Sequence, residues 1–198
     1  MPKLTLDDIV DLRAYERERE DFRRHVIALK KVRRIHLGPV VTLVFENADT
    51  IRFQIQEMAR VEKTISDEGI ETELRIYNPL VPDPGHLAAT LFIELTSEDE
   101  LREWLPKLVG IETSLELRIG PDAAVVPCRV DPEHAKQLTR EEVTASVHYV
   151  HFDLDERAVE TFLAGPVDLA VVHPQYEHVV RLGADTVAEL GRDLVQGG

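Results

Sequence analysis

Apolar positions in the first 80 residues recur mainly with the period of a helix. The first stripe covers residues 12–29 at steps of three and four, which predicts one long helix, or two abutting helices, over roughly 6–35. A second stripe covers residues 51–65 and predicts a helix that begins at position 49 or 50. A serine then opens a shorter predicted helix at 66–77.

Strand patterns follow, as short apolar runs or as alternation with a period of two. Residues 40–45 are β-branched and apolar, which is typical of a buried strand, and residues 87–95 alternate as a strand with one apolar face. Further strands are predicted at 111–119, 124–130, 143–152, 167–172 and 177–182. Short helices are expected among them at 97–108, 155–163 and 185–194.

These elements predict an α+β fold, with long N-terminal helices packed on a largely antiparallel sheet and short helices between the strands. The helical part covers residues 1–80 and the sheet-rich part covers residues 81–198. A proline-rich loop at 79–85 is the only plausible domain boundary in the sequence. We expect this loop to join two parts of a single domain, 1–198.

Composition narrows the class of protein. The 198 residues include 23 Lys+Arg and 37 Asp+Glu, so the formal net charge is −14, which argues against a general nucleic-acid binder. The single cysteine, Cys128, excludes a disulfide scaffold and a cysteine-rich metal site. No apolar run approaches the roughly 18 residues of a membrane-spanning helix, and no secretory signal opens the chain. We therefore expect a cytoplasmic protein that binds neither membranes nor nucleic acid.

The charge is unevenly distributed. Residues 1–37 carry ten basic and seven acidic side chains, whereas the remainder carries a large acidic excess. The basic helix can neutralise its own acidic protein, or it can offer a docking surface for an acidic partner or a second copy of the chain. Nucleic acid or membrane binding is disfavoured because the acidic remainder repels phosphates.

Several segments carry a family resemblance. They are the run 45–62, which contains Phe-Glu-Asn-x-x-Thr and then Gln-x-x-Glu-Met-x-Arg, and the segments Tyr15-Glu16, Lys30 with Arg33-Arg34, Tyr77-Asn78-Pro79 and 89–94. The chain resembles an uncharacterised bacterial family built around a domain of unknown function. The resemblance implies gene neighbours that encode rubrerythrin-like proteins and an iron–sulfur oxidoreductase, and hence an oxidative-stress context with such proteins as partners. It implies no catalytic residue.

The run 45–62 has two interpretations. In the structural one, Glu46, Glu57 and Glu62 are neutralised by cations of the first helix and fix the register of the two helices. Glu62 lies near the apolar stripe and is expected to be partly buried. In the functional one, polar side chains of this run line a pocket for a small ligand or metal. The candidate residues are Glu46, Asn47, Gln54, Glu57, Arg60 and Glu62.

A second candidate region contains His148, His151, His173 and His178, because imidazoles are common metal ligands. Residues three apart in a strand face opposite sides, so His148 and His151 cannot bind one ion together unless a bulge intervenes. One strand histidine with His173 and His178 can. The alternative is that all four are satisfied sheet or loop histidines. Tyr149 is expected to be a packing residue with its hydroxyl reaching water.

The sequence contains no phosphate-binding loop, nucleophile elbow, dinucleotide fingerprint or Glu-x-x-His pair. The leading hypothesis is a non-catalytic accessory or interaction protein in a bacterial redox or oxidative-stress context. The alternative is a small metal- or ligand-binding enzyme or sensor that uses the run 46–62 or the region 148–178. The sequence identifies no cofactor, and it leaves open whether the protein is an enzyme.

Overall fold

The computed structural model describes residues 3–130 and 143–198. The α-helices are α1 (Leu12–Arg33), α2 (Ala48–Glu62), α3 (Asp67–Tyr77), α4 (Glu98–Lys107), α6 (Glu156–Ala164) and α7 (Ala184–Gln196). Short 3-10 helices are η1 (Leu6–Asp8), η2 (Asn78–Leu80) and η3 (Ile111–Thr113). The strands are β1 (Arg34–Leu37), β2 (Val41–Glu46), β3 (His86–Ile93), β4 (Leu115–Ile119), β5 (Ala124–Arg129), β6 (Val147–Asp153), β7 (Val167–His173) and β8 (Tyr176–Arg181).

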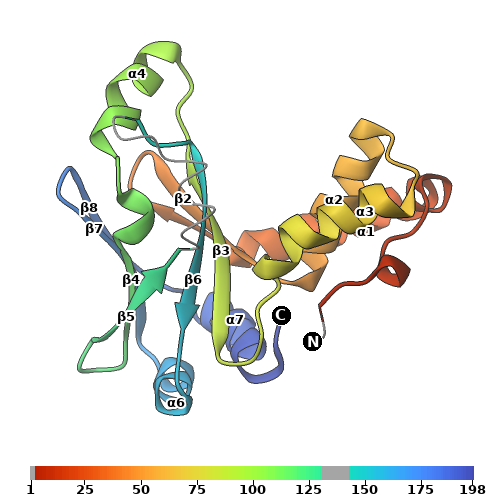
Figure 1. Ribbon diagram of the computed structural model, residues 1–198. Helices are drawn as coiled ribbons and strands as arrows, with labels where there is room; N and C mark the ends of the chain where they lie inside the picture. The colour runs from red at the N-terminus through yellow and green to blue at the C-terminus, as the bar shows by residue number, and fades with distance from the viewer. Residues whose placement is uncertain (1–2, 131–142) are drawn as a thin grey trace.

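The strands of the described residues form one sheet in the order β1-β2-β3-β6-β5-β4-β7-β8 (Figure 1). Every neighbouring pair is antiparallel. The hydroxyl of Tyr176 on β8 donates to the carbonyl of Leu37 on β1 at 2.5 Å and accepts from the N–H of Val40 at 3.2 Å. These bonds link the two ends of the strand order, so the sheet is strongly curled.

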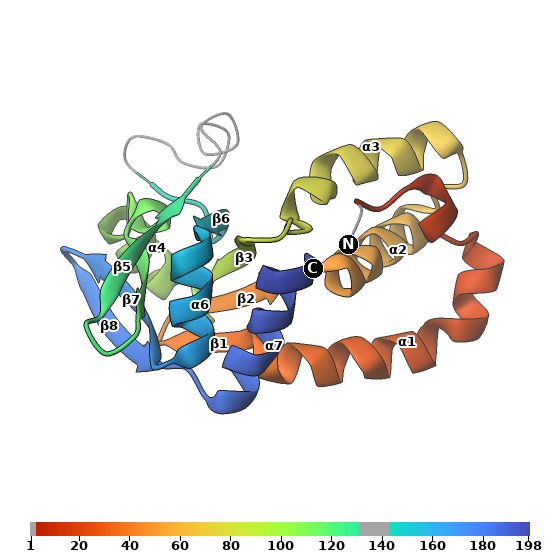
Figure 2. The ribbon, with the colours of Figure 1, turned by 90° about the horizontal axis from the view of Figure 1, so that it is seen from below.

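The main hydrophobic core lies inside the curl. Alternate residues of the strands point into it, and Phe45, Leu91 and Val150 are fully buried there. At one end of the sheet α4 packs Trp104 and Leu105 against this core, and at the other end α6 and α7 cover it (Figures 1 and 2). Burial of this apolar surface is the largest stabilising contribution to the fold.

The helices α2 and α3, with most of α1, form an arm that extends away from the sheet (Figures 1 and 2). Smaller apolar clusters hold the arm. In one of them, Ile51 and Ile55 of α2 meet Leu74 of α3 and Ala88 on the outer face of β3. In another, Phe22 of α1 packs edge-on against Phe53 of α2. Because these clusters are small, polar contacts also fix the position of the arm.

The predicted α+β class is confirmed, with α1 packed on an antiparallel sheet. The strand β1 was not predicted, because the expected helix 6–35 ends at Arg33 and the next four residues alternate as a strand. A short break also separates η1 from α1. Residues 111–113 form a 3-10 helix before β4, and β6 begins at Val147 rather than at 143.

The apolar stripe of α2 was extended too far in the prediction. Lys63 adopts a left-handed conformation that ends the helix, so the stripe loses its register there. Ile65 therefore lies beyond α2 and is 86% exposed, and Val61 in the last turn of the helix is 68% exposed. Within the described residues, no helix is both long and apolar enough to cross a membrane.

Candidate ligand pocket

Three neighbouring strands form the floor of a polar pocket at the base of the arm. Glu46, Thr90 and Tyr149 lie on the outer faces of β2, β3 and β6, and Thr90 pairs directly with Tyr149 across the β3–β6 ladder. Phe45 precedes Glu46 and points to the other face, into the core. The same alternation that fills the core therefore places the polar residues of these strands on the face below the arm.

The arm provides the walls of this pocket. Lys30 comes from α1, Gln54 from α2, and Tyr77 from the junction of α3 with η2. Ile51 of α2 and Phe92 of β3 add apolar surface. The cavity has a volume of about 230 Å³. This is smaller than the cavities that bind drug-sized molecules, so it suits a small ligand.

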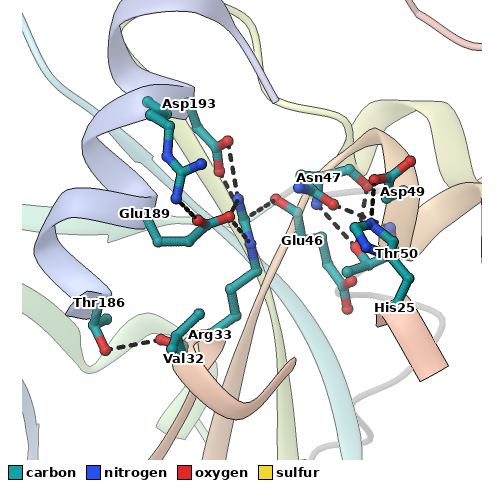
Figure 3. A network of polar contacts seen from close by, with 11 residues as sticks. His25, Val32, Arg33, Glu46, Asn47, Asp49, Thr50, Thr186, Glu189 and Asp193 are labelled. Carbon is teal, nitrogen blue, oxygen red and sulfur yellow. Dashed lines mark hydrogen bonds and ion pairs between the residues drawn. The ribbon is translucent and has the colours of Figure 1, made fainter. Parts of the chain in front are cut away.

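A capping box fixes the wall that α2 contributes. The side chain of Asn47 accepts from the Thr50 N–H at 3.0 Å, and the Thr50 hydroxyl accepts from the Asn47 N–H at 2.9 Å (Figure 3). Asp49 in the same turn pairs with His25 of α1 at 2.8 Å. The Asn47 side chain is therefore used by the helix cap. Asn47 was expected to be a ligand-binding residue, but it is not among the residues that line the pocket.

Glu46 is a buried carboxylate without a cationic partner in the described protein. It is 7% exposed, and its Oε1 accepts a 2.6 Å hydrogen bond from the Thr90 hydroxyl. The nearby guanidinium of Arg33 reaches only the backbone carbonyl of Glu46, at 3.4 Å, and Figure 3 shows the carboxylate pointing away from it. Burying a carboxylate is costly unless a cation or several donors compensate it.

Arg33 cannot supply this compensation because two other carboxylates bind it. Its guanidinium is fully buried and donates to Glu189 at 2.8 Å and to Asp193 at 2.7 Å, both on α7 (Figure 3). Burial raises the pKa of Asp193, and the hydrogen bonds from Arg33 oppose that rise. This network joins α1 to α7 and was not predicted from the sequence.

Lys30 and Tyr149 complete the chemistry of the pocket. Lys30 is half-buried, and its ammonium makes no ion pair with any described residue. Burial raises the pKa of Tyr149 to about 12, and the neighbouring Tyr77 and Glu46 add to the effect. Tyr149 is therefore a neutral phenol at physiological pH. Tyr149 packs against the apolar cluster of the arm, as expected for a packing residue, and it also forms part of the pocket floor.

Glu57 belongs to a different network, further along the arm. Its carboxylate accepts from Tyr15 at 2.7 Å, from Arg19 Nε at 2.7 Å and from Arg60 at 3.4 Å. The hydrogen bond from Arg19, aided by those from Tyr15 and Arg60, lowers the pKa of Glu57 to about 2. Glu57 and Arg60 therefore link α1 to α2, as in the structural interpretation, and neither lines the pocket.

Two further expectations for the run 46–62 differ from the structure. Glu62 is exposed near the end of α2 and pairs with no cation of α1. Glu62 instead lies near Glu73 of α3, whose pKa is raised by burial and by the charge of Glu62. Glu46, expected in the structural interpretation to be neutralised by a cation of the first helix, pairs with none, and Arg34, which directly follows that helix, pairs with Glu94 at 2.9 Å. Of the six candidates, the pocket contains Glu46 and Gln54.

The four histidines of the second candidate region do not form one site. His148 is buried and contacts the Thr144 hydroxyl at 2.8 Å, whereas His151 lies on the opposite face of β6. His173 contacts the Val109 carbonyl at 3.0 Å and accepts from the Gln175 N–H at 3.2 Å. The ring of His178 lies against that of Tyr176, with centroids 4.6 Å apart and planes tilted by 59°. Among the described residues, no three His, Cys, Asp or Glu side chains are grouped to hold a metal ion.

A larger cavity of about 540 Å³ lies between the β4–β5 hairpin and α6. Its charged lining residues are exposed, and two of the carboxylates are already used. Asp153 pairs with Arg129 and His86, each at 2.8 Å, and Asp155 caps α6 by accepting from the Ala158 N–H at 2.7 Å. This cavity has no counterpart to the uncompensated carboxylate of Glu46, so the smaller pocket is the stronger candidate site.

The sequence analysis missed several pocket residues, although signals for some were present. Lys30, Tyr77 and Thr90 all lie in segments that carry the family resemblance. The local pattern does not show that these segments lie near Tyr149. The pairing of β3 with β6, which brings Thr90 next to Tyr149, joins strands more than fifty residues apart. Strand order, which the sequence does not show, brings Thr90 and Tyr149 together.

The fold and the pocket define an α+β protein with a candidate small-molecule site between helical arm and curled sheet. The family model described as "Protein of unknown function (DUF3501)" matches residues 3–194, so the chain belongs to this family. It is 38% identical to a protein of unknown function from Burkholderia pseudomallei K96243, whose crystal structure superposes with a TM-score of 0.89. That match covers 98% of this chain and 100% of the other. None of the curated proteins compared with the chain matches it.

Proposed function

We propose that the protein binds a small polar molecule in the pocket formed by the arm and the outer face of β2, β3 and β6. The observation that carries this proposal is the Glu46 carboxylate, which is buried in the pocket wall without a cation. Proteins satisfy buried charges internally unless the charge serves a ligand or a reaction. The role we propose is binding, as in a sensor or carrier, because the described lining residues give the carboxylate a hydrogen bond from the Thr90 hydroxyl but no cation.

The accessory role in a bacterial redox context remains a second proposal. It rests on the family resemblance and on the exposed basic side chains of α1, which include Arg23 and Lys31. These can dock on an acidic partner such as a rubrerythrin-like protein in the cytoplasm. The test is co-purification with that partner, which this role predicts to occur at low salt and to be lost at high salt. Its loss in a double variant, Arg23→Glu with Lys31→Glu, checks that the contact uses α1.

Ligand binding is tested by measuring the melting temperature with chemically grouped panels of amines, amino acids, carboxylates, phosphate esters and sugars. A ligand that binds only the folded state raises the melting temperature. At least one group should raise it for the wild type. The effect should disappear in Gln54→Trp, which fills the pocket, and should persist in Gln175→Trp, whose exposed loop lies elsewhere. The proposal fails if no group has an effect, or if Gln54→Trp responds like the wild type.

A further inference from the structure

We infer that the ligand is a short zwitterion, with an amine that binds Glu46 and an anionic group that binds Lys30. This inference rests on the proposed function. Among the described residues that line the pocket, Glu46 and Lys30 are the charged ones, and they have opposite signs. Neither forms an ion pair with any described residue. A molecule that carries both charges can therefore satisfy both residues at once.

The surroundings of Glu46 favour an amine over a metal ion. The carboxylate already accepts from the Thr90 hydroxyl, and the described residues that line the pocket include no second carboxylate, histidine or cysteine. A hard cation needs several such ligands, whereas a primary ammonium needs a few acceptors and an apolar or aromatic surround. Tyr77, Phe92 and Tyr149 line the same cavity, and aromatic rings are favourable neighbours for an ammonium group.

Acceptors for the other ammonium hydrogens are also present. The phenol oxygens of Tyr77 and Tyr149 and the amide oxygen of Gln54 belong to the pocket lining. Tyr149 keeps its proton at physiological pH, so it can accept from the amine without adding a second negative charge. The pocket thus has one carboxylate for one positive charge, with neutral acceptors beside it.

The position of Lys30 determines where the anionic group of the ligand binds. It comes from α1, on the arm side of the pocket, whereas Glu46 comes from the end of β2 on the sheet side. A ligand that reaches both must carry its charges at separate positions along a short chain. Because the cavity holds only about 230 Å³, this chain is a few carbons long. Short ω-amino acids are the class that fits these demands.

The test is isothermal titration calorimetry with the series glycine, β-alanine, 4-aminobutyrate and 5-aminopentanoate. Each is compared with the amine and the carboxylate of the same chain length that carry one charge only. At least one amino acid should bind about tenfold or more tightly than both of its analogues, because each charged group adds a charge-assisted hydrogen bond. If no chain length shows this advantage, the inference is wrong.

Variants assign the two ends of the ligand. Glu46→Gln should reduce the affinity for the best amino acid to that of the matching carboxylate. Lys30→Met should reduce it to that of the matching amine. Lys31→Met, which removes an exposed lysine one residue further on, should leave the affinity within about twofold of the wild type.

The outcomes also separate this inference from the proposed function. If amines bind as tightly as the amino acids and Lys30→Met has no effect, the pocket takes a simple cation and the zwitterion is wrong, while ligand binding stands. If Gln54→Trp responds to the panel of small molecules as the wild type does, both proposals fail.

Discussion

Two glutamates eleven residues apart have opposite roles in two regions, Glu57 within the arm and Glu46 where the sheet meets the arm. Glu57 is 23% exposed, yet two arginines and a tyrosine bind it. Glu46 is far more buried, yet its one partner among the described side chains is the Thr90 hydroxyl. The more exposed charge is therefore compensated by two arginines, whereas the more buried charge has no cation among the described residues. A buried charge without an internal partner is therefore the better marker of a binding site here than the run of polar residues itself.

The largest expected effect comes from the boundary between the arm and the sheet. In Arg33→Met, Glu189 and Asp193 keep their negative charges in the interior without the guanidinium. Removing one partner of a buried pair costs about 3–5 kcal/mol. Urea unfolding at neutral pH should show a loss of this size. A loss below about 1 kcal/mol would mean that Glu189 and Asp193 can share a proton or reach water.

The next effect is a pH dependence that belongs to Glu57. Its pKa falls from 4.5 to about 2 in the folded protein, so folding favours the charged form. The stability it contributes is complete above about pH 4.5 and is lost as the pH falls towards 2. Glu57→Gln should lower the unfolding free energy at neutral pH by about 1–3 kcal/mol and flatten its acid dependence.

Asp153 provides the control for that acid dependence. Its hydrogen bonds with Arg129 and then His86 lower its pKa to about 2, so it also loses its contribution in acid. Wild-type stability should therefore fall between about pH 4.5 and pH 2. Glu57→Gln and Asp153→Asn should each remove part of that fall. An unchanged profile in Glu57→Gln would contradict the role of the Arg19 hydrogen bond.

Glu46→Gln should have a much smaller effect on stability. No described cation loses a partner, and a glutamine oxygen still accepts from the Thr90 hydroxyl. The unfolding free energy in the absence of ligand should stay within about 1 kcal/mol of the wild type or rise. Denaturant titration measures this change. A loss above about 2 kcal/mol would mean that the carboxylate is compensated internally, and the comparison with Glu57 would fail.

The smallest effect is expected at Glu62. Its charge raises the pKa of Glu73, so the two carboxylates repel each other between α2 and α3. Glu62→Gln removes that repulsion and should stabilise the protein by no more than about 0.5 kcal/mol. Its melting temperature should rise slightly, and the rise should vanish at high salt. A decrease would show that Glu62 has a favourable partner.

Contacts that depend on local patterns were predictable from the sequence. The helix starts at Ser66 and Ser97, the strand alternation of β3 and the pairing of Glu57 with a first-helix arginine all follow from spacing. The strand β1 escaped prediction because four alternating residues directly follow a long helix. The helical period in front of them masks so short a signal.

Contacts across long sequence separations could not be predicted in the same way. Arg33 meets Glu189 across 156 residues, and the only sequence signal was that Glu189 and Asp193 lie four apart on one helix face. The pocket needed the strand order β2-β3-β6, which brings Glu46, Thr90 and Tyr149 onto one face. The run 46–62 indicated two of the pocket residues, and the tertiary fold supplied the others.

The central claim is that Glu57 serves the fold and Glu46 serves a ligand. The measurement that tests it most directly is the affinity of Glu46→Gln and Glu57→Gln for the tightest-binding ω-amino acid, by isothermal titration calorimetry. We predict that Glu57→Gln binds as the wild type does, although it is less stable, and that Glu46→Gln loses about tenfold or more in affinity. Undiminished binding by Glu46→Gln would contradict the account.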